Sequence, residues 1–375
     1  MGAGPLGFVR LDRLESAPLP APDWVRLRPR LSGICGTDLN VITAHDSFTL
    51  EPYSSYPFTF GHEVVATVTE TGPDVTGWAV GDRVVVNPLL SCAQKGADQC
   101  PACRRGDYGV CRRATDGRGG LTGFSPLAGG GWSDELLAHS SQLRSQGDMP
   151  DSVAVLADPL ASAARGVLDE PPVDGDVVLV LGVGTIGLLT VRALRLTGWA
   201  GTIAILARYP FQARRAAAAG ADVVLDSRSA LYDWAASQPG AHVHKPTLAP
   251  AFVEGGPSLV YDTVGSAATL RDALALTREA GRIVVVGGAG RADVDLTRLW
   301  YRHIRMTGIY VYGSVTYGGR TMDVFDAALE LIRADDLGPL GLVTHTFELE
   351  EYRDAISVAL SKRERESIKV AFRPD

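Results

Sequence analysis

A glycine motif at residues 182–187 is the feature that most constrains the fold of this chain. The apolar, valine-rich run at 177–181, preceded by Asp176, leads directly into three glycines spaced G-x-G-x-x-G, and a helical pattern follows through Leu196. The first glycine permits a tight turn, the second lets backbone approach a pyrophosphate, and the third lets helix pack on strand. A purely structural turn is the alternative to dinucleotide binding. We expect the loop to contact a dinucleotide through Gly182, Gly184, Thr185, Ile186 and Gly187.

From about residue 158, strand-like and helical segments alternate along the chain. Such alternation is typical of a parallel sheet buried on both faces. Residues 1–155 instead contain short apolar strands separated by Gly-Pro-Asp and Val-Gly-Asp turns, and a mixed pattern follows residue 306. We therefore predict an α/β chain, in which a doubly wound parallel Rossmann sheet (156–305) is inserted into a β-rich domain (1–155 plus 306–375).

The end of the second strand of the Rossmann unit bears on the choice of dinucleotide. An acidic residue there accepts hydrogen bonds from the adenosine ribose and favours NAD. The sequence has Ala207 at that place, followed at once by Arg208. A missing carboxylate removes repulsion, and a guanidinium suits a 2′-phosphate. These residues favour NADP(H), although Arg208 is also compatible with a solvated arginine in a chain with 32 arginines among its 36 basic residues.

Four of the five cysteines lie within twenty residues. Cys100, Cys103 and Cys111 have the spacing C-x2-C-x7-C, and Cys92 precedes them across an apparent loop insertion, Ala-Gln-Lys-Gly-Ala-Asp-Gln. Four thiolates close a tetrahedral structural zinc site, whereas three would leave it incomplete. We therefore expect all four to bind one zinc ion, with four free thiols as the alternative.

A second group of metal-binding residue types is dispersed along the chain. Cys35 lies in Gly-Ile-Cys-Gly-Thr-Asp, His62 in Gly-His-Glu, and Asp158 precedes a proline. A Cys, a His and a carboxylate can hold zinc with one open position, which is the arrangement of a catalytic site.

These motifs occur together, and in this order, in the zinc-dependent medium-chain alcohol dehydrogenases, which the chain resembles over nearly its whole length. The resemblance implies a GroES-like catalytic domain, split in sequence around a Rossmann domain, with the active site in the cleft between them. It implies that Cys35, His62 and Asp158 bind the catalytic zinc and that Glu63 is a nearby carboxylate that ligates in some states.

The resemblance also assigns the proton path. Asp38 matches the carboxylate that orients a ligand histidine, and Thr37 matches the hydroxyl that bonds the substrate oxygen and takes its proton. Where several relatives have a relay histidine this chain has Asn40, so the next carrier is water, a ribose hydroxyl or His45, and we expect water. Segments that usually line the nicotinamide include Val264, Gly265, Gly287 and Gly288.

The stretch between Cys35 and His62 is longer than is typical of the family. Its aromatic residues can pack internally or form a wall of the substrate pocket. They are Phe48, Tyr53, Tyr56, Phe58 and Phe60.

The implied function is hydride transfer between a small alcohol or carbonyl substrate and NADP(H), through a zinc-bound alkoxide, with two zinc ions per chain. A zinc-free reductase of activated C=C bonds and a non-catalytic NADPH-binding protein are the alternatives.

The net charge of −7 without long acidic runs argues against nucleic-acid binding, and the longest apolar run is too short and too glycine-rich for a membrane span. No export signal is evident, so we expect a cytoplasmic protein. We also expect a homodimer or a homotetramer.

Overall fold

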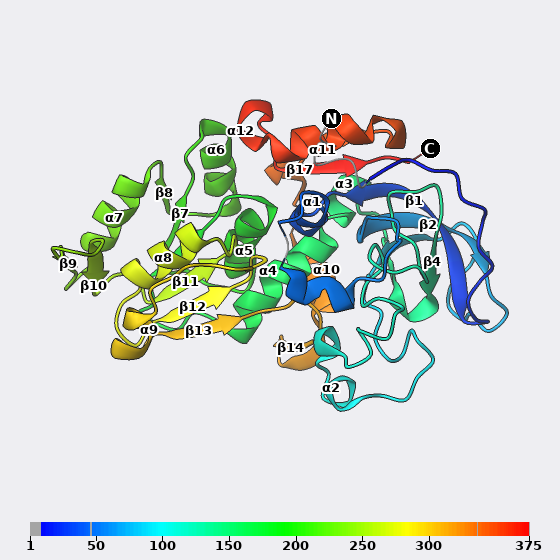
Figure 1. Cartoon of the computed structure of the whole chain (residues 1–375), viewed down its shortest axis with the longest axis horizontal. Coiled ribbons are helices and arrows are strands. Elements are labelled where there is room, and N and C mark those ends of the chain that lie inside the picture. The colour runs from blue at the N-terminus through cyan, green and yellow to red at the C-terminus, as the bar shows by residue number, and fades with distance from the viewer. Residues whose placement is uncertain (1–8, 46, 336, 375) are drawn as a thin grey trace. The chain divides into compact units, whose positions relative to one another are not determined.

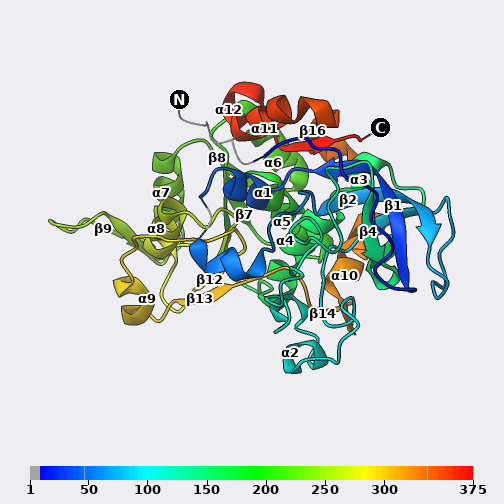
Figure 2. The same ribbon diagram turned by 45° about the vertical axis from the view of Figure 1, so that its right-hand side comes forward.

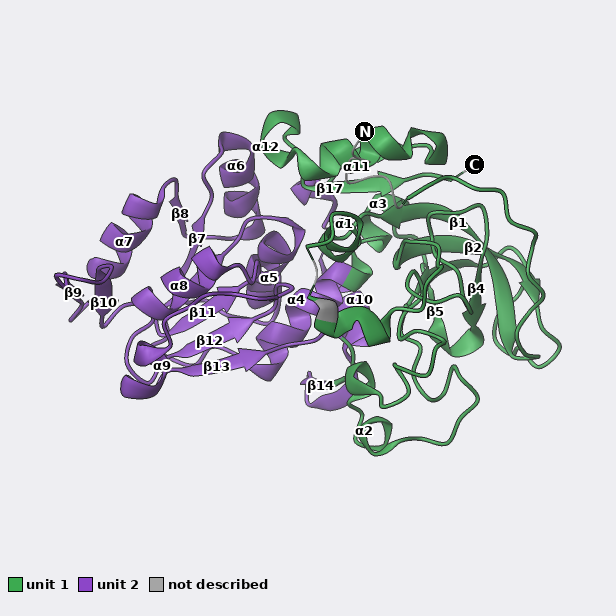
Figure 3. Ribbon diagram, viewed as in Figure 1, with its two compact units in different colours: residues 1–158, 312–314, 342–375 green, residues 159–311, 315–341 purple. Residues whose placement is uncertain are grey.

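The computed structural model describes residues 9–45, 47–335 and 337–374. It divides into two compact units, coloured separately in Figure 3. Unit 1 comprises residues 1–158, 312–314 and 342–375, and unit 2 comprises residues 159–311 and 315–341. The start of the chain, on which the expected lack of an export signal rests, lies outside the described residues. Among the helices that are described, none is long and apolar enough to cross a membrane.

Unit 1 is built on a seven-stranded sheet in the order β16-β17-β1-β2-β3-β5, with β4 also paired to β1. Its neighbours are antiparallel except for β16 and β17, which are parallel. Inward-facing Val25, Leu27, Val64 and Val84 form much of its core. The strands are β1 (Trp24–Gly33), β2 (Glu63–Thr71), β3 (Arg83–Val86), β4 (Leu136–His139), β5 (Leu143–Ser145), β16 (Val343–Phe347) and β17 (Lys369–Phe372).

Short helices and turns connect these strands. The first of them, α1, begins after Cys35, whose backbone N–H donates to the Asp38 carboxylate at 2.8 Å and so satisfies one of the unpaired groups at a helix start. The elements are α1 (Gly36–Ile42), η2 (Phe48–Tyr53), α2 (Pro101–Arg104), η3 (Tyr108–Val110), η4 (Ser140–Gln142), α3 (Asp151–Ala154), η6 (Leu349–Glu351), α11 (Tyr352–Leu360) and α12 (Lys362–Arg365).

Unit 2 contains a six-stranded parallel sheet in the order β13-β12-β11-β6-β7-β8. Strands β11, β12 and β13 lie side by side in Figure 1, and β12 and β13 are labelled again in the turned view of Figure 2. The sheet strands are β6 (Val178–Leu181), β7 (Ile203–Leu206), β8 (Val223–Leu225), β11 (Leu259–Asp262), β12 (Arg282–Val285) and β13 (Arg305–Gly308), and two hairpins add β9 (His242–His244) with β10 (Phe252–Glu254) and β14 (Ser314–Tyr317) with β15 (Arg320–Asp323).

Helices pack against this sheet around a core that includes Leu179, Val260 and Ile283. The helices are α4 (Ala157–Asp169), which continues from unit 1, α5 (Thr185–Leu196), α6 (Pro210–Ala219), α7 (Arg228–Ala236), α8 (Ala267–Leu276), α9 (Thr297–Tyr301), α10 (Val324–Ala334) and η5 (Gly338–Leu340). The predicted fold class, a parallel Rossmann sheet together with a β-rich domain, is confirmed.

Residues 315–341 group with unit 2 rather than with the β-rich unit. The reason is an ion pair between Arg192 of α5 and Asp335 at the end of α10, together with contacts between α6 and η5. The compact part that contains the Rossmann sheet therefore reaches Gly341, beyond the range 156–305 expected from the sequence pattern.

Candidate metal centres and dinucleotide site

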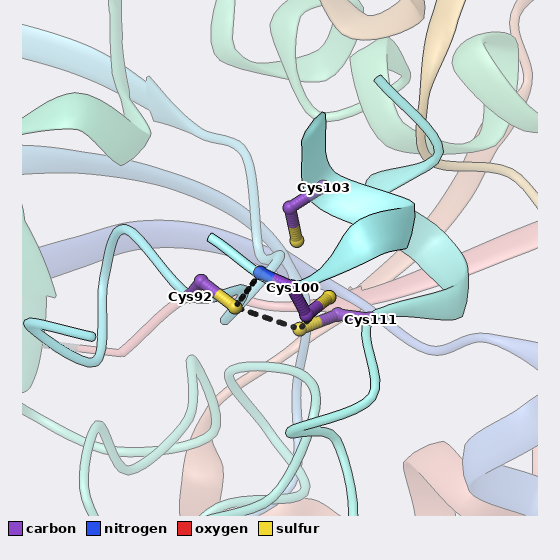
Figure 4. Close-up of side chains that lie close together, drawn as sticks. All are labelled: Cys92, Cys100, Cys103 and Cys111. Atoms are coloured by element: carbon purple, nitrogen blue, oxygen red, sulfur yellow. Dashed lines mark hydrogen bonds between the residues drawn. The ribbon is translucent and has the colours of Figure 1, made fainter. Parts of the chain in front are cut away.

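The four clustered cysteines of unit 1 come together at one point (Figure 4). Their sulfur atoms all lie within 4.8 Å of one another, and none forms a disulfide. Cys92 Sγ lies 3.6 Å from Cys111 Sγ, and Cys100 Sγ lies 4.0 Å from Cys111 Sγ. Four sulfurs at about 2.3 Å from a tetrahedral zinc ion lie roughly 3.8 Å apart. The donor set and its spacing therefore fit a closed zinc site.

Backbone geometry prepares these thiols for a cation. Cys100 is the N-cap of α2, and its N–H donates to Cys92 Sγ at 3.4 Å, while the Arg113 N–H donates to Cys111 Sγ at 3.4 Å. Backbone hydrogen bonds lower the pKa of Cys100 to about 6, whereas burial raises the pKa of Cys103 to about 12. A bound metal ion overrides such differences, because it deprotonates each coordinating thiol.

A buried lysine, Lys95, anchors the loop insertion beside these cysteines. The Lys95 ammonium donates to the Arg113 carbonyl and, at 2.9 Å, to Asp116, which also accepts from Arg118 at 2.8 Å. The insertion at residues 93–99 is therefore tied to the segment that follows Cys111. Sequence reasoning missed this network, although Lys95 is one of only four lysines in the chain.

A second group of ligand atoms belongs to Cys35, His62 and Glu63, and these atoms also lie within 4.8 Å of one another. Cys35 precedes α1, and His62 directly precedes β2. His62 follows Gly61, whose φ of 98° and tight contact with Trp132 leave no room for a side chain. The structure therefore brings together two of the three ligands that the resemblance implies.

His62 is oriented by Asp38. Its Nδ1 atom lies 3.4 Å from Asp38 Oδ1, and neither atom hydrogen-bonds to any described residue. Burial alone lowers the pKa of His62, but the charges of Asp38 and Cys35 outweigh it, so the pKa of His62 is raised well above its usual range. A buried imidazole that lies beside Asp38 and the Cys35 sulfur attracts positive charge in this way, and it fits a metal ligand.

Glu63 is paired with Lys369 of β17. The Lys369 ammonium lies 2.6 Å from both carboxylate oxygens and also donates to the Ile34 carbonyl at 3.2 Å. Both side chains are buried, with 1% and 4% of their areas exposed. Glu63 is therefore engaged by a cation supplied by the chain itself. Sequence reasoning missed Lys369; the one signal was a lysine within an apolar terminal strand.

Asp158 lies near this group but outside the set of mutually close ligand atoms. It is 5% exposed, and its Oδ1 accepts a hydrogen bond from the Tyr312 hydroxyl at 2.6 Å. Burial raises the pKa of Asp158 to about 6; the positive charge of His62 opposes this rise and the negative charge of Glu63 adds to it. These mutual electrostatic effects place Asp158 in the environment of His62 and Glu63, and sequence reasoning missed its partner Tyr312.

The residues of the expected proton path lie on and after α1. The Cys35 thiol lies 3.7 Å from Thr37 Oγ1, so the hydroxyl is adjacent to the ligand group. His45 is exposed, and its Nδ1 atom lies 2.7 Å from Thr43 Oγ1. His45 and Asn40 are joined by a hydrogen bond from the His45 backbone N–H to the Asn40 carbonyl, and no hydrogen bond links the side chains of these two described residues.

Aromatic rings extend from His62 toward the surface of unit 1. The centroids of His62 and Phe124 are 5.5 Å apart, those of Phe124 and Phe58 are 5.2 Å apart, and those of Phe58 and Tyr56 are 4.9 Å apart. Phe60 contacts both Phe58 and Phe124. Part of the aromatic insertion thus packs beside a ligand residue.

Unit 2 builds the glycine loop as the motif predicts. Gly182 follows β6 with a φ of 104°, and a side chain on Gly187 would overlap the Gly182 carbonyl. Gly184 caps α5, so Thr185 and Ile186 start the helix whose N-terminus suits a phosphate.

Two further loops follow the ends of sheet strands in unit 2. Ala207 after β7 is 2% exposed, whereas Arg208 is exposed and has no side-chain partner among the described residues. Asp262 at the end of β11 accepts hydrogen bonds from the N–H groups of Val264 and Gly265, both at 3.0 Å. A side chain on Gly287, which precedes Gly288, would overlap Val264, so these loops are in close contact.

Comparisons with known proteins identify the family of this chain. Residues 21–148 match the model of the alcohol dehydrogenase GroES-like domain, and residues 185–333 match that of the zinc-binding dehydrogenases. A probable alcohol dehydrogenase of Mycobacterium tuberculosis is 30% identical over 362 residues, covering 91% of this chain and 89% of that protein.

Two solved structures extend the comparison. A zinc-binding dehydrogenase from Sinorhizobium meliloti bound to NADP has a TM-score of 0.73 and 26% identity, covering 95% of this chain and 94% of its own. Escherichia coli RspB with NADH has a TM-score of 0.74 and 24% identity, covering 96% and 94%. The chain therefore belongs to the zinc-binding alcohol dehydrogenase family, and it is an oxidoreductase with a nicotinamide dinucleotide cofactor.

Proposed function

We propose that this protein is a zinc-dependent alcohol dehydrogenase or carbonyl reductase that uses NADP(H) in preference to NAD(H). The observation that carries the proposal is the cluster of Cys35, His62 and Glu63, with Asp158 in the same electrostatic environment. Because Lys369 engages Glu63, the ligands we propose are Cys35, His62 and Asp158. Three protein ligands leave a zinc ion one position for substrate, and zinc bound there would supply a Lewis acid that increases the acidity of an alcohol.

The chain's own residues perform the remaining tasks. Asp38 faces Nδ1 of His62 and fixes the imidazole orientation, so that Nε2 is the nitrogen left for a ligand bond. The Thr37 hydroxyl, next to the Cys35 sulfur, hydrogen-bonds the substrate oxygen and accepts its proton. His45 is engaged with Thr43 at the surface, which supports water as the next proton carrier.

The preference for NADP(H) rests on Ala207 and Arg208. A small buried residue replaces the carboxylate that would bind the ribose hydroxyls of NAD, and the adjacent guanidinium is exposed and has no partner within the described part of the chain. An arginine of this kind offers two parallel N–H donors to a phosphate. The 2′-phosphate of NADP is the group it would bind.

The substrate is a small alcohol or carbonyl compound with an apolar part. The rings of Phe124 and Phe58 next to His62 favour apolar contacts over a polyol chain. We further propose that the protein acts in the cytoplasm as a homodimer or homotetramer, which cell fractionation and light scattering test.

The deciding experiment is a panel of alcohols and carbonyls, assayed by nicotinamide absorbance with NADP(H) and with NAD(H). We expect turnover with NADP(H) that is lost after zinc removal and restored by added zinc. Reduction of activated C=C bonds by the zinc-free protein would contradict the proposal and identify the other type of reductase. Cofactor binding with no turnover across the panel would indicate a binding protein.

A further inference from the structure

Tyr312 connects Asp158 to residues 92–111, the segment that holds the four clustered cysteines and is called the lobe below. Its hydroxyl donates to Asp158 Oδ1 at 2.6 Å, and Asp158 Oδ2 accepts no hydrogen bond from the described residues. Both side chains are buried, with 3% of Tyr312 exposed. The phenol therefore fixes one carboxylate oxygen and leaves the other available.

The backbone around Tyr312 is held by the loop between Cys103 and Cys111. The Gly109 N–H donates to the Tyr312 carbonyl at 3.0 Å, and the Ser314 N–H donates to the Gly106 carbonyl at 2.8 Å. Gly106, with a φ of 83°, lies so close to Ser314 that a side chain on it would overlap the serine hydroxyl. Residues 312–314 accordingly group with unit 1, although both flanking segments belong to unit 2.

These contacts form one short path between the two groups of metal-binding residues. The path runs from the loop between Cys103 and Cys111, through the backbone of Tyr312, to its hydroxyl and then to Asp158. Each step is a hydrogen bond or a close backbone contact, which transmits position because buried groups of this kind have few alternative arrangements.

We propose that Tyr312 is the positioning residue of Asp158, and that the four-cysteine lobe holds Tyr312 in place, so that metal in the lobe strengthens metal binding at Cys35, His62 and Asp158. The inference rests on the proposed function, because it takes Asp158 as a metal ligand. Groups that orient a ligand typically change metal affinity 10–100-fold when removed, that is, by roughly one to two orders of magnitude.

The test measures zinc retained per chain across a series of chelator-buffered free zinc concentrations. The step that Cys35→Ser abolishes reports the open site, and the remaining step reports the lobe. We expect Tyr312→Phe to move the open-site step to free zinc concentrations about 10–100-fold higher, and to leave the lobe step unchanged. A general loss of stability would move both steps. Tyr301→Phe is the matched control, because Tyr301 is 62% exposed.

A second pair of variants tests the link to the lobe. Cys103→Ser, which removes a ligand of the lobe, should by itself move the open-site step to higher free zinc concentrations. In the Tyr312→Phe background it should move that step little further. If circular dichroism shows that Cys103→Ser is unfolded, Gly109→Pro takes its place. Proline lacks the N–H that binds the Tyr312 carbonyl, and its fixed φ falls in the range of a 3₁₀ helix such as η3.

Asp158→Ala separates failure of this inference from failure of the proposed function. If Asp158→Ala weakens the open site but Tyr312→Phe behaves as wild type, Tyr312 does not position the ligand. If the lobe variant and Tyr312→Phe have independent, additive effects, the lobe does not act through Tyr312. If Asp158→Ala also binds zinc as wild type does, Asp158 is not a ligand and both proposals are overturned.

Discussion

Replacement of Lys369 by methionine removes one partner of the buried pair with Glu63. Methionine keeps a similar length and volume but carries no charge. The Glu63 carboxylate would lose both 2.6 Å contacts while remaining 1% exposed, and the Ile34 carbonyl would lose its donor. The variant therefore leaves a buried, uncompensated charge.

The expected loss follows from that burial. Removing one member of a buried ion pair costs about 3–5 kcal/mol, because the other charge stays desolvated. Each kcal/mol shifts the melting temperature of a unit of this size by about 2–4 °C. The apparent melting temperature of Lys369→Met should therefore fall by roughly 6–20 °C.

The assay is thermal unfolding of protein depleted of zinc by a chelator, because a zinc ion beside Glu63 would offset the unpaired charge; unfolding is followed by circular dichroism at one fixed heating rate. Lys245→Met is the control, because Lys245 is exposed on unit 2. Lys369→Met combined with Glu63→Gln should recover more than half of the loss, since no unpaired charge remains. A Lys369→Met melting temperature equal to that of the control would refute the reasoning.

Three further predictions follow from other sites. Arg208→Ala should weaken NADP(H) binding by about 1.5–3 kcal/mol and leave NAD(H) binding nearly unchanged in titration calorimetry; equal losses would show that Arg208 does not bind the 2′-phosphate. Thr37→Val should lower turnover by a factor of about 10²–10⁴, and His45→Ala by less than about tenfold; a drop in the turnover of His45→Ala as large as that of Thr37→Val would make His45 the proton carrier. Burial raises the pKa of Asp116, but the hydrogen bonds from Lys95 and Arg118 outweigh burial, so the pKa lies below its ordinary value. The ionised carboxylate therefore stabilises the fold above its ordinary pKa, and this stabilisation is lost as the pH falls through the lower pKa of the folded state. Asp116→Asn should therefore lower the free energy of unfolding, measured with a chemical denaturant at pH 7, and the difference from wild type should shrink below about pH 4. A difference that does not depend on pH would contradict a stabilising ion pair.

The local sequence patterns were sufficient for the fold and for the glycine loop. A buried strand, a G-x-G-x-x-G turn and a helix are contiguous in the chain, so the constraints on Gly182 and Gly187 could be predicted from neighbouring residues alone. The four cysteines likewise lie within one short segment, whose loops bring their sulfurs together.

The partners of the site could not be predicted in the same way. Glu63 and Lys369 are 306 positions apart, and Asp158 and Tyr312 are 154 positions apart. Neither Lys369 nor Tyr312 belongs to a local motif, and each meets its partner only because the C-terminal strand and a three-residue segment return to unit 1. The long-range packing that places them has no signature in a single sequence.

Metal content tests most directly the central claim that one chain holds an open and a closed zinc site. Elemental analysis of protein purified without added metal, beside the Cys35→Ser and Cys103→Ser variants, gives the occupancy of each site. The two donor sets predict about two zinc ions per chain for the wild type and about one for each variant. A wild type with one zinc ion or none, or a Cys35→Ser variant that keeps both, would contradict the account.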